Sequence, residues 1–299
     1  MVTEQEVEAI GRTLLDPAQP LPARFRALFT LRNLGGRAAV GWISRGFGDS
    51  SALLKHELAY CLGQMREAAA IPVLLRVLQD PRQEPMVRHE AGEALGAIGN
   101  PEVLDVLKRY SEDPVVEVAE TCQLAVRRLE WLQENAEEPG GSPYLSVDPA
   151  PPAEETDVAK LRDALLDESR ALFDRYRAMF ALRNLGGREA ALALVDGLRS
   201  GSALFRHEIG YVLGQLRHEA SVPGLTAALR SRAESAMVRH ECAEALGAIA
   251  LEGCRETLRA FAGDDERVVR ESCEVALDML AYETGSQFQY ADGLCKLQA

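Results

Sequence analysis

The sequence predicts an all-α fold, in which helical hairpins repeat to form an α-α superhelix of two duplicated halves with about four hairpins each. Two nested internal repeats predict this fold, one spanning about half of the chain and one of 33 residues. Repeats of about 20–50 residues are typical of solenoids, in which each unit buries its apolar face against its neighbours. Alternation of β-branched and polar residues, which would indicate strands, is almost absent.

The longer repeat has an offset of 151 residues. Residues 24–36 (RFRALFTLRNLGG) and 175–187 (RYRAMFALRNLGG) are identical at ten of thirteen positions. Residues 86–98 (MVRHEAGEALGAI) and 237–249 (MVRHECAEALGAI) are identical at eleven of thirteen. The chain therefore consists of two tandem copies of one half.

The shorter repeat carries a His-Glu pair. The pair occurs four times, at His56-Glu57, His89-Glu90, His207-Glu208 and His240-Glu241. The two pairs in each half are 33 residues apart, which is the length of a helical hairpin with two amphipathic runs. Turn-forming residues separate the runs, at Gly35-Gly36, Asp80-Pro81, Asn100-Pro101 and Asp113-Pro114.

The boundaries of the halves follow from composition. We expect residues 1–133 to form the N-terminal half and residues 157–299 the C-terminal half. Residues 134–156 are rich in Pro, Gly, Ser and Glu and have no apolar period, so a flexible linker is expected there. The tail beyond Tyr282 is weakly patterned and is expected to fray.

The charge of the chain narrows the class of partner. The chain has 33 basic and 46 acidic residues and a formal net charge of −13. A chain this acidic repels phosphate backbones, so nucleic acid is not expected as a partner, whereas a basic protein, a polyamine or a cation would be attracted. With 47% hydrophobic and 26% charged residues, the composition is that of a globular protein and excludes a disordered or fibrous chain.

The sequence also predicts a cytoplasmic protein without a membrane segment. The N-terminal residues are acidic and lack the order of a secretory signal, and no apolar run approaches the roughly 20 residues that cross a bilayer. The six cysteines show no CxxC spacing, so we expect reduced and mostly buried thiols.

The four histidines face away from the apolar stripes of their helices. On a helix over residues 51–65, Leu54 and Leu58 belong to the buried stripe, and His56 lies about 200° from Leu54. His89 lies opposite the stripe of its own helix, and the second half repeats both patterns. The histidines are therefore expected outside the apolar core, on the second helix of each hairpin, where that helix lines the concave face of the solenoid.

The same helix faces continue with two further sets of residues. One turn after the pairs come Tyr60 and Tyr211, or Glu93 and Glu244. The glycines that follow are Gly63, Gly96, Gly214 and Gly247. Small residues at these positions would let another group approach the helix backbone closely.

Imidazole and carboxylate groups presented together are nitrogen and oxygen ligands for metals, and the repeated pairs indicate two metal ions or one shared centre. No cysteine joins the set, which argues against a structural zinc site. Two histidines and one carboxylate per ion form the ligand set of non-haem Fe(II) sites that keep positions open for oxygen. Neither the HExxH motif of zinc proteases nor the Glu-x-x-His motif of four-helix di-iron bundles is present.

Other interpretations of the pairs remain open at this point. Each pair could be a solvated surface pair, the concave face could bind a basic peptide without catalysis, or the ligands could hold two zinc ions in a hydrolase. Four of the five histidines occupy the repeat-equivalent position, which argues against surface pairs. The fifth, in His218-Glu219, has Glu67-Ala68 as its counterpart and belongs to no set.

The motifs that distinguish this chain are HELAY at 56–60, HEIGY at 207–211 and VRHE at 87–90 and 238–241. Their complete set, in a duplicated frame of HEAT-like hairpins, resembles the deoxyhypusine hydroxylase family. Single repeats of this kind are also similar to HEAT-like bilin lyases and to scaffolding proteins, but those lack the four pairs. The resemblance covers nearly the whole chain.

The resemblance implies a non-haem di-iron monooxygenase. Such an enzyme hydroxylates the deoxyhypusine side chain of eukaryotic translation initiation factor 5A, its protein substrate, to give hypusine. It would use two iron ions (Fe²⁺) and O₂, through a di-iron peroxo centre between the two halves. We expect such a protein to act as a monomer, without nucleic acid or membrane.

The resemblance also implies roles for eight residues. One iron would be held by His56, His89 and Glu90, and the other by His207, His240 and Glu241. Glu57 and Glu208 would be the catalytic carboxylates that bind the ammonium groups of the substrate.

Overall fold

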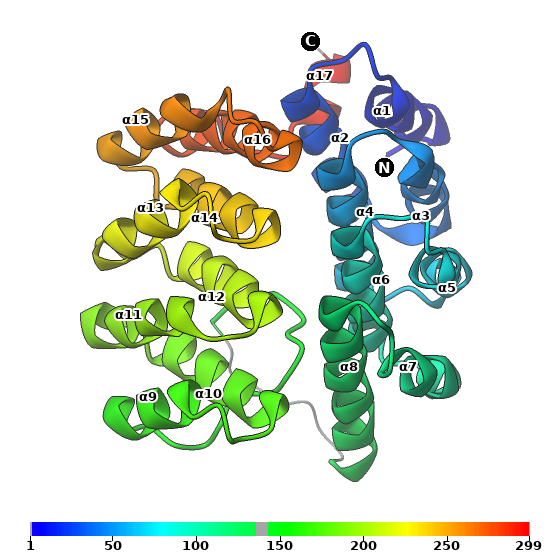
Figure 1. The fold of residues 1–299 in the computed structure, drawn as a ribbon. Helices are drawn as coiled ribbons and strands as arrows, with labels where there is room; N and C mark the ends of the chain where they lie inside the picture. Colours follow the sequence, from blue (N-terminus) through cyan, green and yellow to red (C-terminus); the bar gives the residue numbers. More distant parts are fainter. Residues whose placement is uncertain (1, 136–142, 299) are drawn as a thin grey trace. The chain divides into compact units, whose positions relative to one another are not determined.

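The computed structural model describes residues 2–135 and 143–298, and these residues form helices and no strands. The described chain divides into two compact units, residues 1–129 with 286–299 and residues 130–285. Each unit contains four helical hairpins in two layers (Figure 1). The predicted all-α fold of repeated hairpins in two duplicated halves is thereby confirmed.

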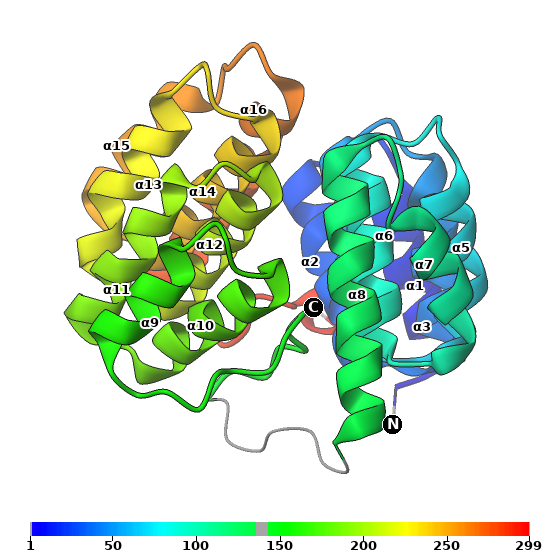
Figure 2. The same cartoon turned by 60° about the horizontal axis from the view of Figure 1, so that its bottom comes forward.

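The N-terminal hairpins are α1 (Glu4–Leu15) with α2 (Leu21–Leu34), α3 (Gly36–Ser44) with α4 (Ala52–Met65), α5 (Ile71–Gln79) with α6 (Pro85–Ile98), and α7 (Leu104–Tyr110) with α8 (Val116–Glu134). The short 3₁₀ turns are η1 (Arg45–Gly48), η2 (Ala68–Ala70) and η3 (Pro101–Val103). The even-numbered helices form one layer and the odd-numbered helices the other (Figures 1 and 2). Both His-Glu pairs of this half lie on even helices.

The C-terminal hairpins repeat this order. They are α9 (Val158–Leu166) with α10 (Leu172–Leu185), α11 (Gly187–Asp196) with α12 (Ala203–Leu216), α13 (Val222–Arg230) with α14 (Ala236–Ile249), and α15 (Glu252–Phe261) with α16 (Arg267–Glu283). The 3₁₀ turns are η4 (Gly197–Arg199) and η5 (Glu219–Ser221), and a last helix, α17 (Gly293–Gln298), lies near the C-terminus. None of the described helices is long and apolar enough to span a membrane.

Serine caps fix the start of the two helices that carry the first pair of each half. The hydroxyl of Ser51 accepts a hydrogen bond from the backbone N–H of Leu54 (3.0 Å), and that of Ser202 from Phe205 (3.0 Å). A side-chain acceptor at this position satisfies a backbone donor that the helix leaves unpaired. The cap therefore sets where α4 and α12 begin, and with it the direction in which His56 and its counterpart point.

Neighbouring even helices approach each other closely at glycine. A Cβ atom on Gly63 of α4 would lie 2.7 Å from the Cα atom of Ala94 on α6, and one on Gly247 of α14 would lie 2.7 Å from the carbonyl oxygen of Ala276 on α16. The group that closely approaches the backbone at these two glycines is thus the next even helix. Because the backbones are so close, His-Glu side chains on adjacent helices can meet.

In four of the eight hairpins, a buried arginine joins the two helices. Arg88, directly before His89, donates from Nε to the carbonyl oxygen of Leu78 at the end of α5 (2.9 Å) and from Nη2 to Asp113 (2.6 Å). The arrangement recurs from Arg24 to Leu14 and Asp49, from Arg175 to Leu165 and Ser200, and from Arg239 to Leu229 and Asp264. These arginines satisfy carbonyl groups at the ends of the odd helices, and two of them, Arg88 and Arg239, lie on the helices α6 and α14 that bear His-Glu pairs.

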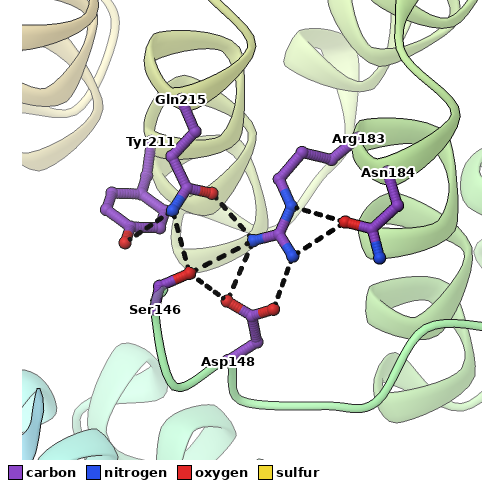
Figure 3. A network of polar contacts seen from close by, with 6 residues as sticks. All are labelled: Ser146, Asp148, Arg183, Asn184, Tyr211 and Gln215. Atoms are coloured by element: carbon purple, nitrogen blue, oxygen red, sulfur yellow. Dashed lines mark hydrogen bonds and ion pairs between the residues drawn. The ribbon is translucent and has the colours of Figure 1, made fainter. Parts of the chain in front are cut away.

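Residues 143–156 of the expected linker lie against the C-terminal hairpins. Asp148 forms an ion pair with Arg183 (2.6 Å), a side chain that is fully buried. The network around this pair consists of Ser146, Asp148, Arg183, Asn184, Tyr211 and Gln215 (Figure 3). Ala150 is buried, and the N–H of Ala153 donates to the carbonyl oxygen of Arg177 (2.9 Å). This segment therefore packs as part of the second unit.

The tail beyond α16 lies against the N-terminal hairpins. Arg26 on α2 binds Gln287 (3.0 Å) and Asp292 (3.0 Å), and its guanidinium stacks over the ring of Tyr290. The N–H of Gly293 donates to the hydroxyl of Thr30 (3.0 Å). Contacts thus group residues 286–299 with the first unit. The boundaries 1–133, 134–156 and 157–299 remain a prediction from composition.

Candidate metal centres

The N-terminal candidate centre lies between α4 and α6. The ring centroids of His56 and His89 are 5.4 Å apart, and Nε2 of His56 lies 3.2 Å from Oε2 of Glu90. All three side chains are buried, with residue exposures of 4%, 0% and 3%. Glu57, next to His56 on α4, is 7% exposed. The first half thus brings together the two imidazoles and the carboxylate that the sequence predicted.

The C-terminal candidate centre repeats this geometry between α12 and α14. The rings of His207 and His240 have centroids 5.2 Å apart, and Oε2 of Glu241 lies 3.3 Å from Nε2 of His207 and 3.9 Å from Nε2 of His240. These three residues are also buried, as is Glu208 at 3% exposure. The duplication therefore preserves three-dimensional geometry as well as sequence.

The donor set and its spacing fit a metal ion in each half. Two ligand atoms that bind one ion at about 2.1 Å lie roughly 3–3.5 Å apart, close to the His–Glu distances of 3.2 and 3.3 Å. The ligand atoms of His207, His240 and Glu241 all lie within 4.8 Å of one another. Two imidazoles and one carboxylate leave coordination positions open for further ligands.

Negative charge gathers around the N-terminal candidate centre. Burial, reinforced by the carboxylates of Glu57 and Glu90, raises the pKa of the Cys61 thiol well above its usual value. In the other half, burial and the carboxylate of Glu241 raise the pKa of Cys242. The thiols are therefore protonated at neutral pH, and no cysteine belongs to the clusters of possible ligands among the described residues. Buried carboxylates are costly without a compensating positive charge, and a divalent cation would provide one.

The structure corrects one expectation about the histidines. The sequence placed them outside the apolar core, yet His89 and His240 are completely buried, and His56 and His207 are 4% exposed. The helical wheel places them on the face opposite the apolar stripe, but it cannot show what covers that face. Carboxylate and hydroxyl groups of Glu90, Thr121, Glu241 and Glu244 lie near the rings.

All six cysteines are free thiols, and five of them are buried, in agreement with the expectation from their spacing. Burial raises the pKa of Cys122 and of Cys273 to about 12. The fifth histidine, His218, uses Nδ1 to accept the N–H of Ala220 (3.1 Å) at the start of η5. Its role is local and structural, which agrees with its exclusion from the set.

Sequence reasoning gave no role to four residues that lie beside the histidines. In the first half, Oγ1 of Thr121 on α8 is 3.4 Å from Nδ1 of His89, and Glu93 has a carboxylate oxygen within 4.8 Å of ligand atoms of His89 and Glu90. In the second half, Oε1 of Glu244 is 3.5 Å from Nδ1 of His240, and the hydroxyl of Ser272 on α16 donates to the same oxygen (3.4 Å). The signal that could have revealed them is the 151-residue offset, which relates Thr121 to Ser272 and Glu93 to Glu244.

Comparison with known proteins decides the family. A chicken (Gallus gallus) protein named deoxyhypusine hydroxylase is 84% identical over 299 residues, which covers all of both chains. The chain belongs to the deoxyhypusine hydroxylase family. The human deoxyhypusine hydroxylase is 75% identical over 298 residues, covering 100% of this chain and 99% of the relative. The family resemblance inferred from the four pairs is thereby confirmed.

Structural comparison agrees with this family. The solved structure of human deoxyhypusine hydroxylase in complex with glycerol has a TM-score of 0.92 and 75% identity, and the match covers 93% of this chain and 97% of that one. Family models described as HEAT repeats match residues 41–127 and 191–278, and one described as a PBS lyase HEAT-like repeat matches residues 174–200. Membership in this family makes the chain a hydroxylase built from HEAT repeats.

Proposed function

We propose that this protein uses iron and O₂ to hydroxylate the deoxyhypusine side chain of eukaryotic translation initiation factor 5A, giving hypusine. The observation that carries the proposal is the buried His₂Glu cluster that recurs in each half of a deoxyhypusine hydroxylase family member. A binding scaffold would not need two buried sets of metal ligands. We further propose that it acts in the cytoplasm as a monomer, and the six free thiols support a reducing compartment.

Six residues would hold the metal. His56, His89 and Glu90 would bind one iron, and His207, His240 and Glu241 the other. A pair of ferrous ions supplies electrons for the reduction of O₂ and an oxidant strong enough to attack an unactivated methylene group, which no protein side chain can do. The contribution of the chain is to fix the ligands by burial, to exclude water and to orient the substrate.

Glu57 and Glu208 would bind the substrate. Each follows a proposed ligand histidine directly in the sequence, and each is buried. Deoxyhypusine is a long amine that carries positive charges, so a buried carboxylate would form a strong charge-assisted hydrogen bond with an ammonium group. The net charge of −13 would also attract a basic substrate loop.

Metal analysis of the purified protein tests the proposal. We expect two irons per chain, visible absorption in the oxidised state, and a gain of one oxygen atom in the deoxyhypusine form of the initiation factor. His56→Ala and His207→Ala should each lower the iron content and abolish hydroxylation, whereas His218→Ala should change neither.

The competing functions give different results. Two zinc ions in a colourless protein would indicate a hydrolase. A protein that binds a basic peptide without metal, and whose histidine variants keep their affinity, would be a scaffold. Either result would overturn the proposal.

A further inference from the structure

A polar side chain stands behind the most deeply buried histidine of each half. His89 and His240 are completely buried, and their Nδ1 atoms lie 3.4 Å from the hydroxyl oxygen of Thr121 and 3.5 Å from Oε1 of Glu244, respectively. In the second half, Nε2 of His240 lies on the side of Glu241, at 3.9 Å, and Nδ1 lies on the side of Glu244, at 3.5 Å. The ring of His240 therefore has a ligand side, where Nε2 faces Glu241, and a rear side, where Nδ1 faces Glu244.

The last even helix of each half contributes a hydroxyl group to this rear side. Thr121 on α8 is 1% exposed and Ser272 on α16 is fully buried. Ser272 donates to Oε1 of Glu244, which is the same oxygen that faces His240. Neither α8 nor α16 carries a His-Glu pair. Their hydroxyl groups nevertheless bring these two helices into the candidate centres, which the sequence pattern did not reveal.

We propose that Thr121 with Glu93, and Ser272 with Glu244, are positioning residues that orient His89 and His240 toward the metal. This inference rests on the proposed function. A histidine that binds a metal through Nε2 keeps its proton on Nδ1 and needs an acceptor there, which fixes both the tautomer and the ring orientation. Thr121 supplies a hydroxyl acceptor to His89, and Glu244 supplies a carboxylate acceptor to His240.

Duplication strengthens the inference. Thr121 and Ser272 are equivalent at the 151-residue offset, and so are Glu93 and Glu244. Glu93 and Glu244 lie four residues after their histidines, a spacing that places side chains side by side on a helix. The contacts of 3.4–3.5 Å are at the long end of the hydrogen-bond range.

The test measures metal binding by the full-length protein, with Co²⁺ as the probe, by competition with a chelator and by visible absorption. Glu244→Gln and Thr121→Val should each weaken one of the two binding steps by about 10- to 100-fold, the usual effect of removing such a partner. Both steps should still reach completion at saturating metal. Ser272→Ala should weaken the same step as Glu244→Gln, but less.

The chain itself suggests the conservative controls. Thr121→Ser and Ser272→Thr exchange the residues found at equivalent positions, keep the hydroxyl group, and should retain the wild-type affinity. Glu252→Gln alters a glutamate at the exposed start of α15 and should have no effect. Thermal unfolding of the metal-free variants should match the wild type, which separates an effect on the site from a loss of folding.

Each alternative outcome has its own meaning. Variants that bind both ions with wild-type affinity and spectrum would overturn the positioning role and leave the proposed function intact. Loss of one ion even at saturating metal would show that the altered residue is a ligand, which also overturns the assignment. A wild-type protein that binds no divalent ion would overturn the proposed function together with this inference.

Discussion

At the scale of single residues, the two candidate centres depend on side chains that are expensive to bury. Glu57 and Glu208 are 7% and 3% exposed, and the burial of a carboxylate costs free energy. In the proposed function, these carboxylates bind the ammonium groups of a cationic substrate. Their position next to His56 and His207 would bring the bound amine close to the ions.

The first prediction concerns these two carboxylates. Glu57→Gln and Glu208→Gln keep the shape of the side chain and remove its charge, so each should lower kcat/KM by roughly 10- to 100-fold, which corresponds to the loss of a charged hydrogen bond. The iron content should stay at the wild-type level. Steady-state assays with the deoxyhypusine protein, together with metal analysis, check both parts. Normal activity in both variants would contradict the substrate-binding role.

The residues of the candidate centres could be predicted from the sequence only in part. His56, His89 and their counterparts were evident because a rare residue recurs at a fixed period on one helix face. Thr121 and Ser272 were not, because a hydroxyl residue is common on any helix and stands out only when the two halves are aligned. Thr121 reaches His89 from a helix 32 residues further along the chain. Burial of the histidines also escaped prediction, since a helical wheel does not reveal what packs on a face.

At the scale of the helical elements, charge inside the hairpin is balanced locally. The hydrogen bonds from Arg239 hold the pKa of Asp264 below its usual value. The side chains of this pair are 3% and 6% exposed, so little solvent screens them. Burial alone would raise the pKa of Asp113 in the other half, but the hydrogen bonds from Arg88 and from the N–H of Val115, together with the charge of Arg88, outweigh burial and lower the pKa.

A second prediction follows from these shifts. A carboxyl group whose pKa is lower in the folded state contributes stability above its unfolded pKa, near 3.8, and that contribution is lost as the pH falls through the lower folded value. Arg239→Ala should therefore cost roughly 3 kcal/mol at neutral pH, because it leaves a buried carboxylate unpaired.

The penalty should shrink at acidic pH, where Asp264 becomes protonated. Chemical denaturation at about pH 7 and pH 3 measures the difference, and Arg232→Ala, which alters an exposed partner of Asp265, is the control. A penalty of equal size at both pH values would contradict the assignment of this pair.

A third prediction uses two glycines in helices. Gly63→Ala places a Cβ atom 2.7 Å from the Cα atom of Ala94, so α4 and α6 must separate, at a cost of about 1–3 kcal/mol. Gly41→Ala, in α3, meets no atom within 4 Å and should stabilise the protein by about 0.5–1 kcal/mol through helix propensity. Thermal unfolding of both variants measures the two effects, which should have opposite signs.

Helical hairpins and their ends could be predicted because apolar periodicity and Gly-Pro punctuation are local signals. The arginine contacts within the hairpins could not, because their partners vary. Asp49 in the first half is replaced at the equivalent position by Ser200, which still binds Arg175 (3.0 Å) and in turn donates to Glu168 (3.2 Å). The contact cannot be recognised from the sequence because an aspartate accepts the hydrogen bond of the arginine in one half and a serine accepts it in the other.

At the scale of the whole molecule, each unit includes a segment that follows the last hairpin of the other half. The segment after α8 packs on α10 and α12 through Asp148 and Arg183, and the segment after α16 packs on α2 through Asp292 and Arg26. Arg26 and Arg177, which contact these segments, are equivalent at the 151-residue offset. Composition predicted a flexible linker and a frayed tail because both segments lack an apolar period. Composition does not reveal that a buried ion pair can hold such a segment in place.

The fourth prediction concerns the tail. Removing residues 286–299 takes away Gln287, Tyr290 and Asp292, which contact the guanidinium of Arg26, a side chain that is 7% exposed. The loss of the Asp292 carboxylate weakens the compensation of a buried charge. The truncated protein should unfold at a temperature several degrees lower than the full chain. Removing only residues 296–299 should have little effect, because Asp292, Tyr290 and Gln287 remain. Differential scanning calorimetry compares the three proteins, and an unchanged melting temperature would contradict the anchoring role of the tail.

The placement of the tail has a consequence for dissection of the protein. A fragment that stops at residue 133 keeps Arg26 and Thr30 but loses the peptide that binds them, while a fragment that starts at residue 134 carries this peptide as an unused ligand. The first fragment therefore lacks part of its own packing, and the second fragment contains the segment that supplies it. When both fragments are produced together, we expect them to associate through binding of the tail to α2.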